Sequence, residues 1–100
     1  MKKNFSLIIS DEAYLDIADT FTWYDAIEEP LGKKFIISFE SSLNTLLNNP
    51  LSYHVRYKNV RIIFMKRFPY GIHYVIDGNI LKVIAVFHTS RNPQNWEDRL

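Results

Sequence analysis

The chain has 100 residues, 47% of them hydrophobic, and a formal net charge of +1. This length fits a single domain over residues 1–100, because such a chain can bury roughly two-thirds of its unfolded surface. The absence of cysteine excludes disulfides, thiolate nucleophiles and cysteine-based zinc sites, and no apolar run approaches the roughly 20 residues of a membrane span. The apolar run Leu7-Ile8-Ile9 is also too short for a signal peptide, so we expect a cytoplasmic protein.

Residues 4–9 alternate loosely between apolar and polar side chains and predict a short first strand. Ser10 can then serve as an N-cap, and Asp11 and Glu12 place negative charge in the first turn, where the helix dipole favours it. The following residues have the period of an amphipathic helix that ends before Pro30. The predicted buried stripe of this helix is Tyr14, Ile17, Ala18, Phe21, Tyr24 and Ile27, whereas Asp16, Asp19 and Asp25 are predicted to face away.

A second helix is predicted to begin near Leu31-Gly32 and to end at Asn48-Asn49-Pro50, where asparagine and proline are stop signals. The two helices should form an antiparallel pair. Trp23 and Tyr24 are predicted to pack in the core of this pair, and a partner contact is the alternative role of Trp23. The apolar stripe of the second helix is Phe35, Phe39, Leu43, Leu46 and Leu47.

Residues 51–59 have no clear period and predict a connector, after which three strands are expected at residues 60–65, 70–76 and 80–87. Asp77-Gly78-Asn79 separates the last two strands, and its Asp-Gly step supplies the positive φ of a tight hairpin. The last strand is nearly continuous apolar and is predicted to be central. A short closing helix after Pro93, through Asn95 to Arg99, is predicted, with Trp96 pinning it to the sheet edge. The predicted fold is therefore an α+β two-layer sandwich: an N-terminal strand, an antiparallel helix pair and a three-stranded antiparallel meander.

The charge is divided unevenly along the chain. Residues 1–50 contain four Lys or Arg against eight Asp or Glu, and residues 51–100 contain eight against three. A positive C-terminal half can attract nucleic acid or an acidic protein surface, and the two halves can also complement each other within one fold. The three histidines, His54, His73 and His88, lack the close spacing of a zinc motif and no glycine-rich phosphate loop is present, so we expect neither metal nor cofactor.

The sheet face opposite the helices must be either polar or covered, which makes it the expected partner-binding surface. The candidate partner-binding residues on this face and at its end are Arg67, Tyr70, His73, Tyr74, His88, Arg91 and Trp96.

Two motifs in the second half are distinctive, namely Arg67-Phe68-Pro69-Tyr70 and His88-x-x-Arg91-x-Pro93-x-x-Trp96. With Trp23-Tyr24 and Leu31-Gly32-Lys33-Lys34-Phe35 upstream, the chain resembles the RelE/ParE superfamily, the small toxins of bacterial type II toxin–antitoxin pairs. The resemblance covers residues 11–99. It implies the same fold and a toxin that inhibits growth, serves plasmid stabilisation and is neutralised by protein–protein interaction with a cognate antitoxin.

The resemblance also bears on the cellular target. Nuclease members of the superfamily carry lysines on the first strand of the meander and an arginine after the tyrosine that begins the next strand. The corresponding positions here hold Ile62, Phe64 and Gly71, so the known cationic set is absent. This difference favours the ParE branch, whose studied members act on DNA gyrase by binding, and therefore a protein that is not an enzyme.

A ribosome-dependent mRNA endoribonuclease of the RelE type is the alternative hypothesis. Its candidate catalytic residues are Arg67, His73, His88 and Arg91, since histidine can act as acid or base near neutral pH and arginine can stabilise phosphorane charge. His88 also has a structural interpretation, in which its ring ends the strand by bonding to the backbone of the following turn. A non-toxic binding or regulatory relative is the second alternative.

Overall fold

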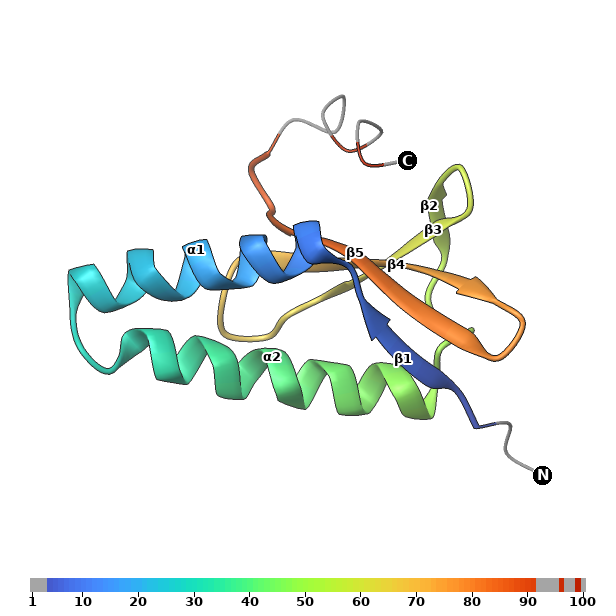
Figure 1. Cartoon of the computed structure of the whole chain (residues 1–100), viewed down its shortest axis with the longest axis horizontal. Helices are drawn as coiled ribbons and strands as arrows, with labels where there is room; N and C mark the ends of the chain where they lie inside the picture. The colour runs from blue at the N-terminus through green and yellow to red at the C-terminus, as the bar shows by residue number, and fades with distance from the viewer. Residues whose placement is uncertain (1–3, 92–95, 97–98, 100) are drawn as a thin grey trace.

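The computed structural model describes residues 4–91, 96 and 99, and two helices pack on one face of a five-stranded sheet (Figure 1). The helices are α1 (Asp11–Ile27) and α2 (Leu31–Asn48). The strands are β1 (Ser6–Ile9), β2 (Val55–Tyr57), β3 (Val60–Phe64), β4 (Tyr70–Asp77) and β5 (Ile80–His88). This architecture confirms the predicted α+β fold with its antiparallel helix pair. No helix in the described part of the chain has the length and apolar character needed to cross a membrane.

The sheet order is β1-β5-β4-β3-β2, with β1 parallel to β5 and every other neighbouring pair antiparallel. The prediction that β5 is central is confirmed, and Gly78 has the positive φ of 60° expected in the hairpin before it. The predicted three-stranded meander is present as β3-β4-β5, and β2, which lies within the expected connector, extends it by a fourth strand. Three residues are too few to show a strand period, so β2 is defined only by its pairing with β3.

Helix α1 begins as predicted, since the hydroxyl of Ser10 accepts a hydrogen bond from the backbone N–H of Ala13 at 3.1 Å. Its buried face differs from the predicted stripe and is centred on Ala13, Ile17 and Thr20. Tyr14 and Ile27 are each 57% exposed. The buried face thus combines the small side chains of Ala13 and Thr20 with Ile17, and the larger Tyr14 and Ile27 lie on exposed sides of the helix.

Helix α2 has the predicted bounds and apolar stripe, and it approaches α1 closely at Gly32. The backbone N–H of Gly32 donates to the carboxylate of Asp25 at 2.8 Å. A Cβ at Gly32 would lie 2.7 Å from the carbonyl oxygen of Phe21, which is closer than atoms normally approach. The predicted helix start near Leu31-Gly32 is thus also the point where the two helices require a residue without a side chain.

We expect Gly32→Ala to destabilise the protein by about 1–2 kcal/mol, because overpacking against a backbone carbonyl outweighs the small gain in helix propensity. Urea unfolding followed by circular dichroism measures the change. Glu40→Ala on the exposed side of α2 is the control and should stay within about 0.5 kcal/mol of the parent. Equal stability of the Gly32 and Glu40 variants would contradict this account of the helix contact.

Two apolar clusters cover the two faces of the sheet. The main core lies between the helices and the sheet, and it includes Phe35, Phe39, Leu46, Ile72 and Tyr74. A smaller cluster lies on the opposite face and consists of Val60, Ile84, Ala85 and Phe87, with Tyr57, Val75 and Trp96 packed against it. The face expected to be open is therefore partly covered by the chain itself.

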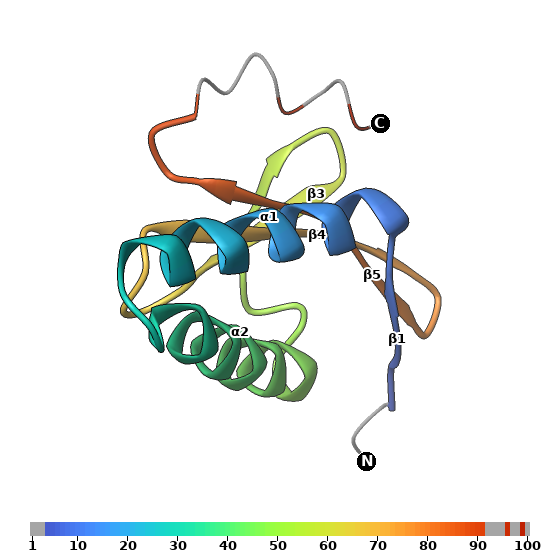
Figure 2. The same ribbon diagram turned by 60° about the vertical axis from the view of Figure 1, so that its left-hand side comes forward.

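The chain leaves β5 on the side of the sheet away from α2 (Figure 2). The predicted closing helix lies outside the described residues apart from Trp96 and Arg99. The ring of Trp96 packs against His73 and Tyr57, with centroid distances of 4.9 and 5.4 Å. Trp96 therefore anchors the C-terminal segment on the second face of the sheet.

Trp23 and Tyr24 have different environments, although both were predicted to lie in the helix-pair core. The prediction is wrong for Trp23, which is 58% exposed. Tyr24 packs in an aromatic cluster with Phe35, Phe68 and Tyr70, at centroid distances of 5.9, 5.0 and 6.2 Å. The turn Arg67-Phe68-Pro69-Tyr70 is thus held to the helices by aromatic packing.

Candidate partner-binding groove

Two of the predicted partner-binding residues are inaccessible. His73 is 2% exposed and Tyr74 is fully buried, so the expectation that they lie on an open surface is wrong. Both are on β4, which has a neighbouring strand on each side and side chains packed on both faces. The hydroxyl of Tyr74 donates to the carbonyl of Pro50 at 2.7 Å, and burial raises the pKa of Tyr74 to about 12. Tyr74 is therefore a core residue that anchors the chain following α2.

His73 is enclosed beneath the second face. Its Nδ1 lies 2.9 Å from the hydroxyl of Tyr57, and the ring of Trp96 packs edge-on against it. Burial lowers the pKa of His73 to about 4, and the positive charges of Arg91 and Arg99 act in the same direction, opposed by Asp16. The imidazole is therefore neutral at neutral pH and has a structural role in this packing.

The depressed pKa of His73 predicts a pH dependence of stability. The unfolded chain, with a histidine pKa near 6.5, binds more protons than the folded chain between pH 6.5 and 4, so the free energy of unfolding falls as the pH is lowered through this window. The loss attributable to His73 is up to about 3 kcal/mol. Urea unfolding from pH 7.5 to 4.5 should give a smaller slope for His73→Gln than for the parent. His54→Gln, at an exposed residue, should keep the parental slope, and equal slopes for all three proteins would contradict the prediction.

Tyr70 and His88 lie together at the end of the sheet, with ring centroids 5.1 Å apart. Tyr70 is 9% exposed and belongs to the main core, whereas His88 is exposed. The Nδ1 of His88 accepts a hydrogen bond from the backbone N–H of Ser90 at 3.0 Å and lies 2.8 Å from its hydroxyl. This geometry agrees with the structural interpretation of His88 as a strand-ending residue.

The four residues considered for RNA cleavage lie in different environments. The guanidinium of Arg91 lies 4.0 Å from the ring centroid of Phe87, on the second face of the sheet. Arg67 lines a groove beside α2, on the helix side. Since His73 is buried and His88 bonds to its own turn, the structure does not bring these residues into one catalytic site.

A groove of about 910 Å³ lies between α2 and β3, and we call it the α2/β3 groove. Helix α2 supplies one wall with small hydroxyl side chains and Ile37. The other wall comes from the segment preceding β2, from β3 and from the turn before β4. The apolar residues of the whole groove are Ile37, Tyr53, Ile62, Ile63, Phe64 and Phe68.

The charge of the α2/β3 groove is entirely positive. Lys34, Arg56, Lys66 and Arg67 line it, and none of the described residues that line it is acidic. Arg56 also lies over the ring of Phe64, 5.5 Å from its centroid. Ile37 and Phe64, 57% and 48% exposed, provide apolar surface between the cations. Such a groove suits an amphipathic protein segment that carries both apolar and acidic side chains.

Of the residues around this groove, only Arg67 was predicted to contact a partner. Lys34, Arg56 and Lys66 were not, because they come from three segments that only the fold brings together. The aromatic and basic character of residues 53–58 was the available signal, since Tyr53, His54 and Arg56 all line the groove.

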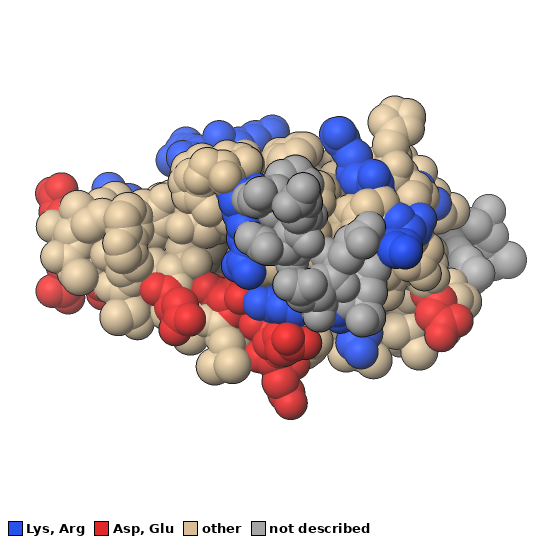
Figure 3. Space-filling view, turned by 90° about the horizontal axis from the view of Figure 1, so that it is seen from above, with Lys and Arg blue, Asp and Glu red and all other residues tan. Residues whose placement is uncertain are grey.

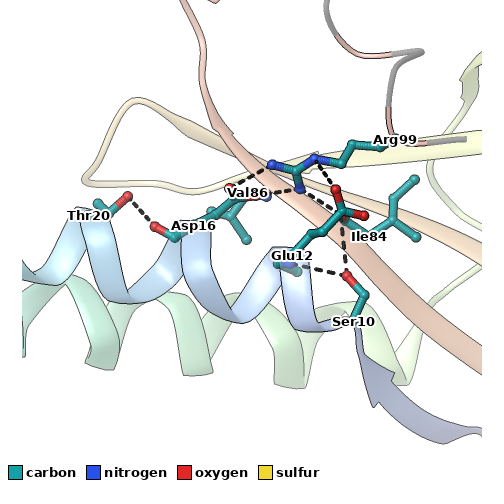
Figure 4. A network of polar contacts seen from close by, with 8 residues as sticks. Ser10, Glu12, Asp16, Thr20, Ile84, Val86 and Arg99 are labelled. Carbon is teal, nitrogen blue, oxygen red and sulfur yellow. Dashed lines mark hydrogen bonds and ion pairs between the residues drawn. The ribbon is translucent and has the colours of Figure 1, made fainter.

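The acidic first half of the chain is in part balanced within the fold. Figure 3, seen from above, shows red acidic groups along the lower border and at the left end of this face, and separate blue Lys and Arg groups across its upper and middle part. Figure 4 shows the main link, in which the guanidinium of Arg99 donates to both carboxylate oxygens of Asp16 at 3.0 and 2.9 Å. The same carboxylate accepts from the backbone N–H of Val86 at 2.9 Å, so the prediction that Asp16 faces away is wrong.

These features define a small α+β protein with a cationic and apolar groove suited to a protein segment, and its described residues contain no group of metal-ligating side chains. Residues 7–93 match the family described as ParE toxin of type II toxin-antitoxin system, parDE, and the chain belongs to this family. The predicted membership of the RelE/ParE superfamily and its ParE branch is thereby confirmed.

The fold has a solved counterpart described as the chromosomal ParDE TA system from P. aeruginosa. The two chains superpose with a TM-score of 0.79 at 15% sequence identity, over 89% of this chain and 100% of the other. No curated protein matches the sequence. The structural likeness therefore supports the fold, and the family assignment rests on the sequence match.

Proposed function

We propose that this chain is the toxin of a type II toxin–antitoxin pair, that a cognate antitoxin neutralises it by binding the α2/β3 groove, and that the free toxin acts by binding DNA gyrase. Membership of the ParE toxin family supports the toxin assignment. The groove supports an antitoxin partner, because its four cations and apolar wall complement an acidic amphipathic segment.

The observation that supports a binding mechanism is the close packing of β3 and β4 side chains around Gly71. Gly71 pairs with Phe64, and a Cβ at Gly71 would lie 2.9 Å from the Cγ2 of Ile62 and 3.3 Å from the ring of Phe64. The resemblance places the cations of the nuclease relatives at Ile62, Phe64 and Gly71, and in this chain those positions hold apolar atoms. A phosphorane dianion would lack these three cations, which supports action by binding.

The test is a titration of purified toxin, free of antitoxin, into a DNA gyrase supercoiling assay. We expect progressive loss of supercoiling, reversed when the product of the neighbouring reading frame is added. A parallel reaction with ribosome-bound mRNA should leave the mRNA intact. Codon-dependent cleavage of that mRNA would overturn the binding mechanism, and normal growth on induced expression would identify a non-toxic relative.

A further inference from the structure

Helix α1 presents a row of exposed side chains at a spacing of four residues. Leu15, Trp23 and Ile27 are 63%, 58% and 57% exposed, and Asp19, which lies between Leu15 and Trp23 in this row, is also exposed. Residues four apart are neighbours on a helix surface, and such rows form the ridges that fit into grooves when helices pack. We call Leu15, Asp19, Trp23 and Ile27 the α1 ridge, which is about 18 Å long at about 1.5 Å per residue.

The α1 ridge is part of an acidic helix. Helix α1, which the structure describes throughout, contains five Asp or Glu and no Lys or Arg. Asp16 is paired with Arg99, whereas Asp19 lies exposed on the ridge. The ridge therefore has the chemistry that the α2/β3 groove favours, because four cations and exposed apolar surface line the groove and none of the described residues that line it is acidic.

The α2 wall of the groove can accommodate large side chains. Four small hydroxyl residues form this wall, namely Ser38, Ser41, Ser42 and Thr45. They leave room beside the helix for an indole or a branched side chain. Their hydroxyl oxygens can also accept a hydrogen bond from the indole N–H of Trp23, a donor that needs a partner when it is buried. The large residues of the ridge and the small residues of the wall are therefore complementary in size.

The ridge cannot occupy the groove of its own chain. The carboxylate of Asp16 accepts a hydrogen bond from the backbone N–H of Val86 at 2.9 Å, which fixes α1 beside β5, whereas the groove lies between α2 and β3. None of the residues of α1 lines the groove. The two complementary surfaces can therefore meet only between two copies of the chain.

We infer that this chain associates with itself head to tail, the α1 ridge of one copy docking in the α2/β3 groove of the next. Such a contact is heterologous, so one copy keeps a free groove, the other keeps a free ridge, and further copies can add. The contact is weak and reversible, because a single helix ridge buries little surface. The groove is also the proposed antitoxin site, so self-association and antitoxin binding exclude each other there. The inference itself needs no antitoxin, so failure of either proposal leaves the other intact.

Sedimentation velocity of the purified full chain, free of antitoxin, tests self-association. In about 0.05 M salt, the weight-average mass should rise above the monomer mass of 11.9 kDa as the protein concentration increases to about 0.5 mM. The mass should fall back toward the monomer value at about 1 M salt, where the screening length is about 3 Å. A mass that stays at 11.9 kDa at every protein concentration in low salt would overturn the inference.

Two double variants identify the two surfaces. Asp19→Lys with Trp23→Ala disables the ridge and keeps the groove, whereas Lys66→Glu with Arg67→Glu disables the groove and keeps the ridge. Each double variant alone should remain monomeric. Their equimolar mixture should form a one-to-one dimer of about 24 kDa, twice 11.9 kDa, because each variant supplies the surface that the other lacks.

The matched control for the ridge variant is Tyr14→Ala with Asp77→Lys. It removes an exposed aromatic side chain of α1 that lies outside the ridge, and it makes the same change of charge at an exposed residue that does not line the groove. This control should associate as the parent does. Monomeric behaviour of the control would overturn the assignment of the ridge, because loss of an aromatic residue and a charge at any place would then suffice.

The remaining outcomes distinguish a head-to-tail contact from a symmetric one. A mixture that stays monomeric would overturn the inference, and so would association retained by either double variant alone, since contacts between two ridges or two grooves would then suffice. Circular dichroism melting curves verify that the variants fold. If one does not, NMR of the parent decides: the indole N–H of Trp23 and the methyl groups of Ile37 should shift together with concentration, and the lack of either shift would contradict the inference.

Discussion

Lys66→Glu combined with Arg67→Glu is expected to weaken antitoxin binding by at least about 100-fold, which corresponds to about 2.7 kcal/mol. The two substitutions reverse the charge where the turn between β3 and β4 lines the α2/β3 groove. An acidic segment docked there would lose favourable pairs and meet like charges instead, and like-charge juxtaposition in an interface costs several kcal/mol. Isothermal titration calorimetry with the neighbouring gene product measures the change.

The matched control applies the same change of net charge away from the groove. Lys33→Glu with Lys82→Glu alters two exposed lysines, neither of which lines the groove. This control should weaken binding less than about fivefold at 0.15 M salt, where charges beyond about 8 Å are largely screened. Similar losses for both double variants would mean that only net charge matters, and the groove would lose its assignment.

Asp16→Ala is expected to reduce the free energy of unfolding by about 3 kcal/mol, lowering the melting temperature by more than about 10 °C. The side chains of Asp16 and Arg99 are only 13% and 15% exposed, so removing the carboxylate leaves a largely buried guanidinium without its bidentate partner. It also removes the acceptor for the backbone N–H of Val86. Urea unfolding followed by circular dichroism measures the loss.

Glu12→Ala provides the comparison, because Glu12 pairs with the same guanidinium at 3.3 Å but is 63% exposed. Exposed ion pairs contribute about 0–1 kcal/mol, so this variant should lose no more than that. If Asp16→Ala is as mild as Glu12→Ala, the pair between Asp16 and Arg99 does not hold the C-terminal segment in solution.

The helices were predictable because their signals are local. Ser10 is a residue type that begins helices, and it is the N-cap of α1. Pro30 is a residue type that interrupts helices, and it lies between the end of α1 and the start of α2. The hairpin at Gly78 was predictable for the same reason, since a positive φ favours glycine within a short sequence window. Strand β2 could not be predicted, because three residues become a strand only through pairing with β3.

The candidate site was less predictable because it depends on contacts between distant residues. His73 has the sequence pattern of a half-exposed strand residue, yet Tyr57 and Trp96, 16 and 23 positions away in the sequence, cover it. Asp16 has the helical spacing of a solvent-facing residue, and its burial depends on Arg99 near the other end of the chain. The groove combines α2 with residues that follow it, so a single-segment pattern could identify only Arg67.

The parallel pairing of β1 with β5 has a consequence for the synthesis of this protein. Ser6–Ile9 is synthesised before its neighbour in the sheet, Ile80–Val83, and both helices and the strands β2, β3 and β4 are translated in between. The sheet therefore cannot be completed until β5 has been translated, and a product interrupted before β5 lacks the strand that pairs with β1. The finished fold, and with it any activity that needs the fold, becomes available only after translation has passed β5.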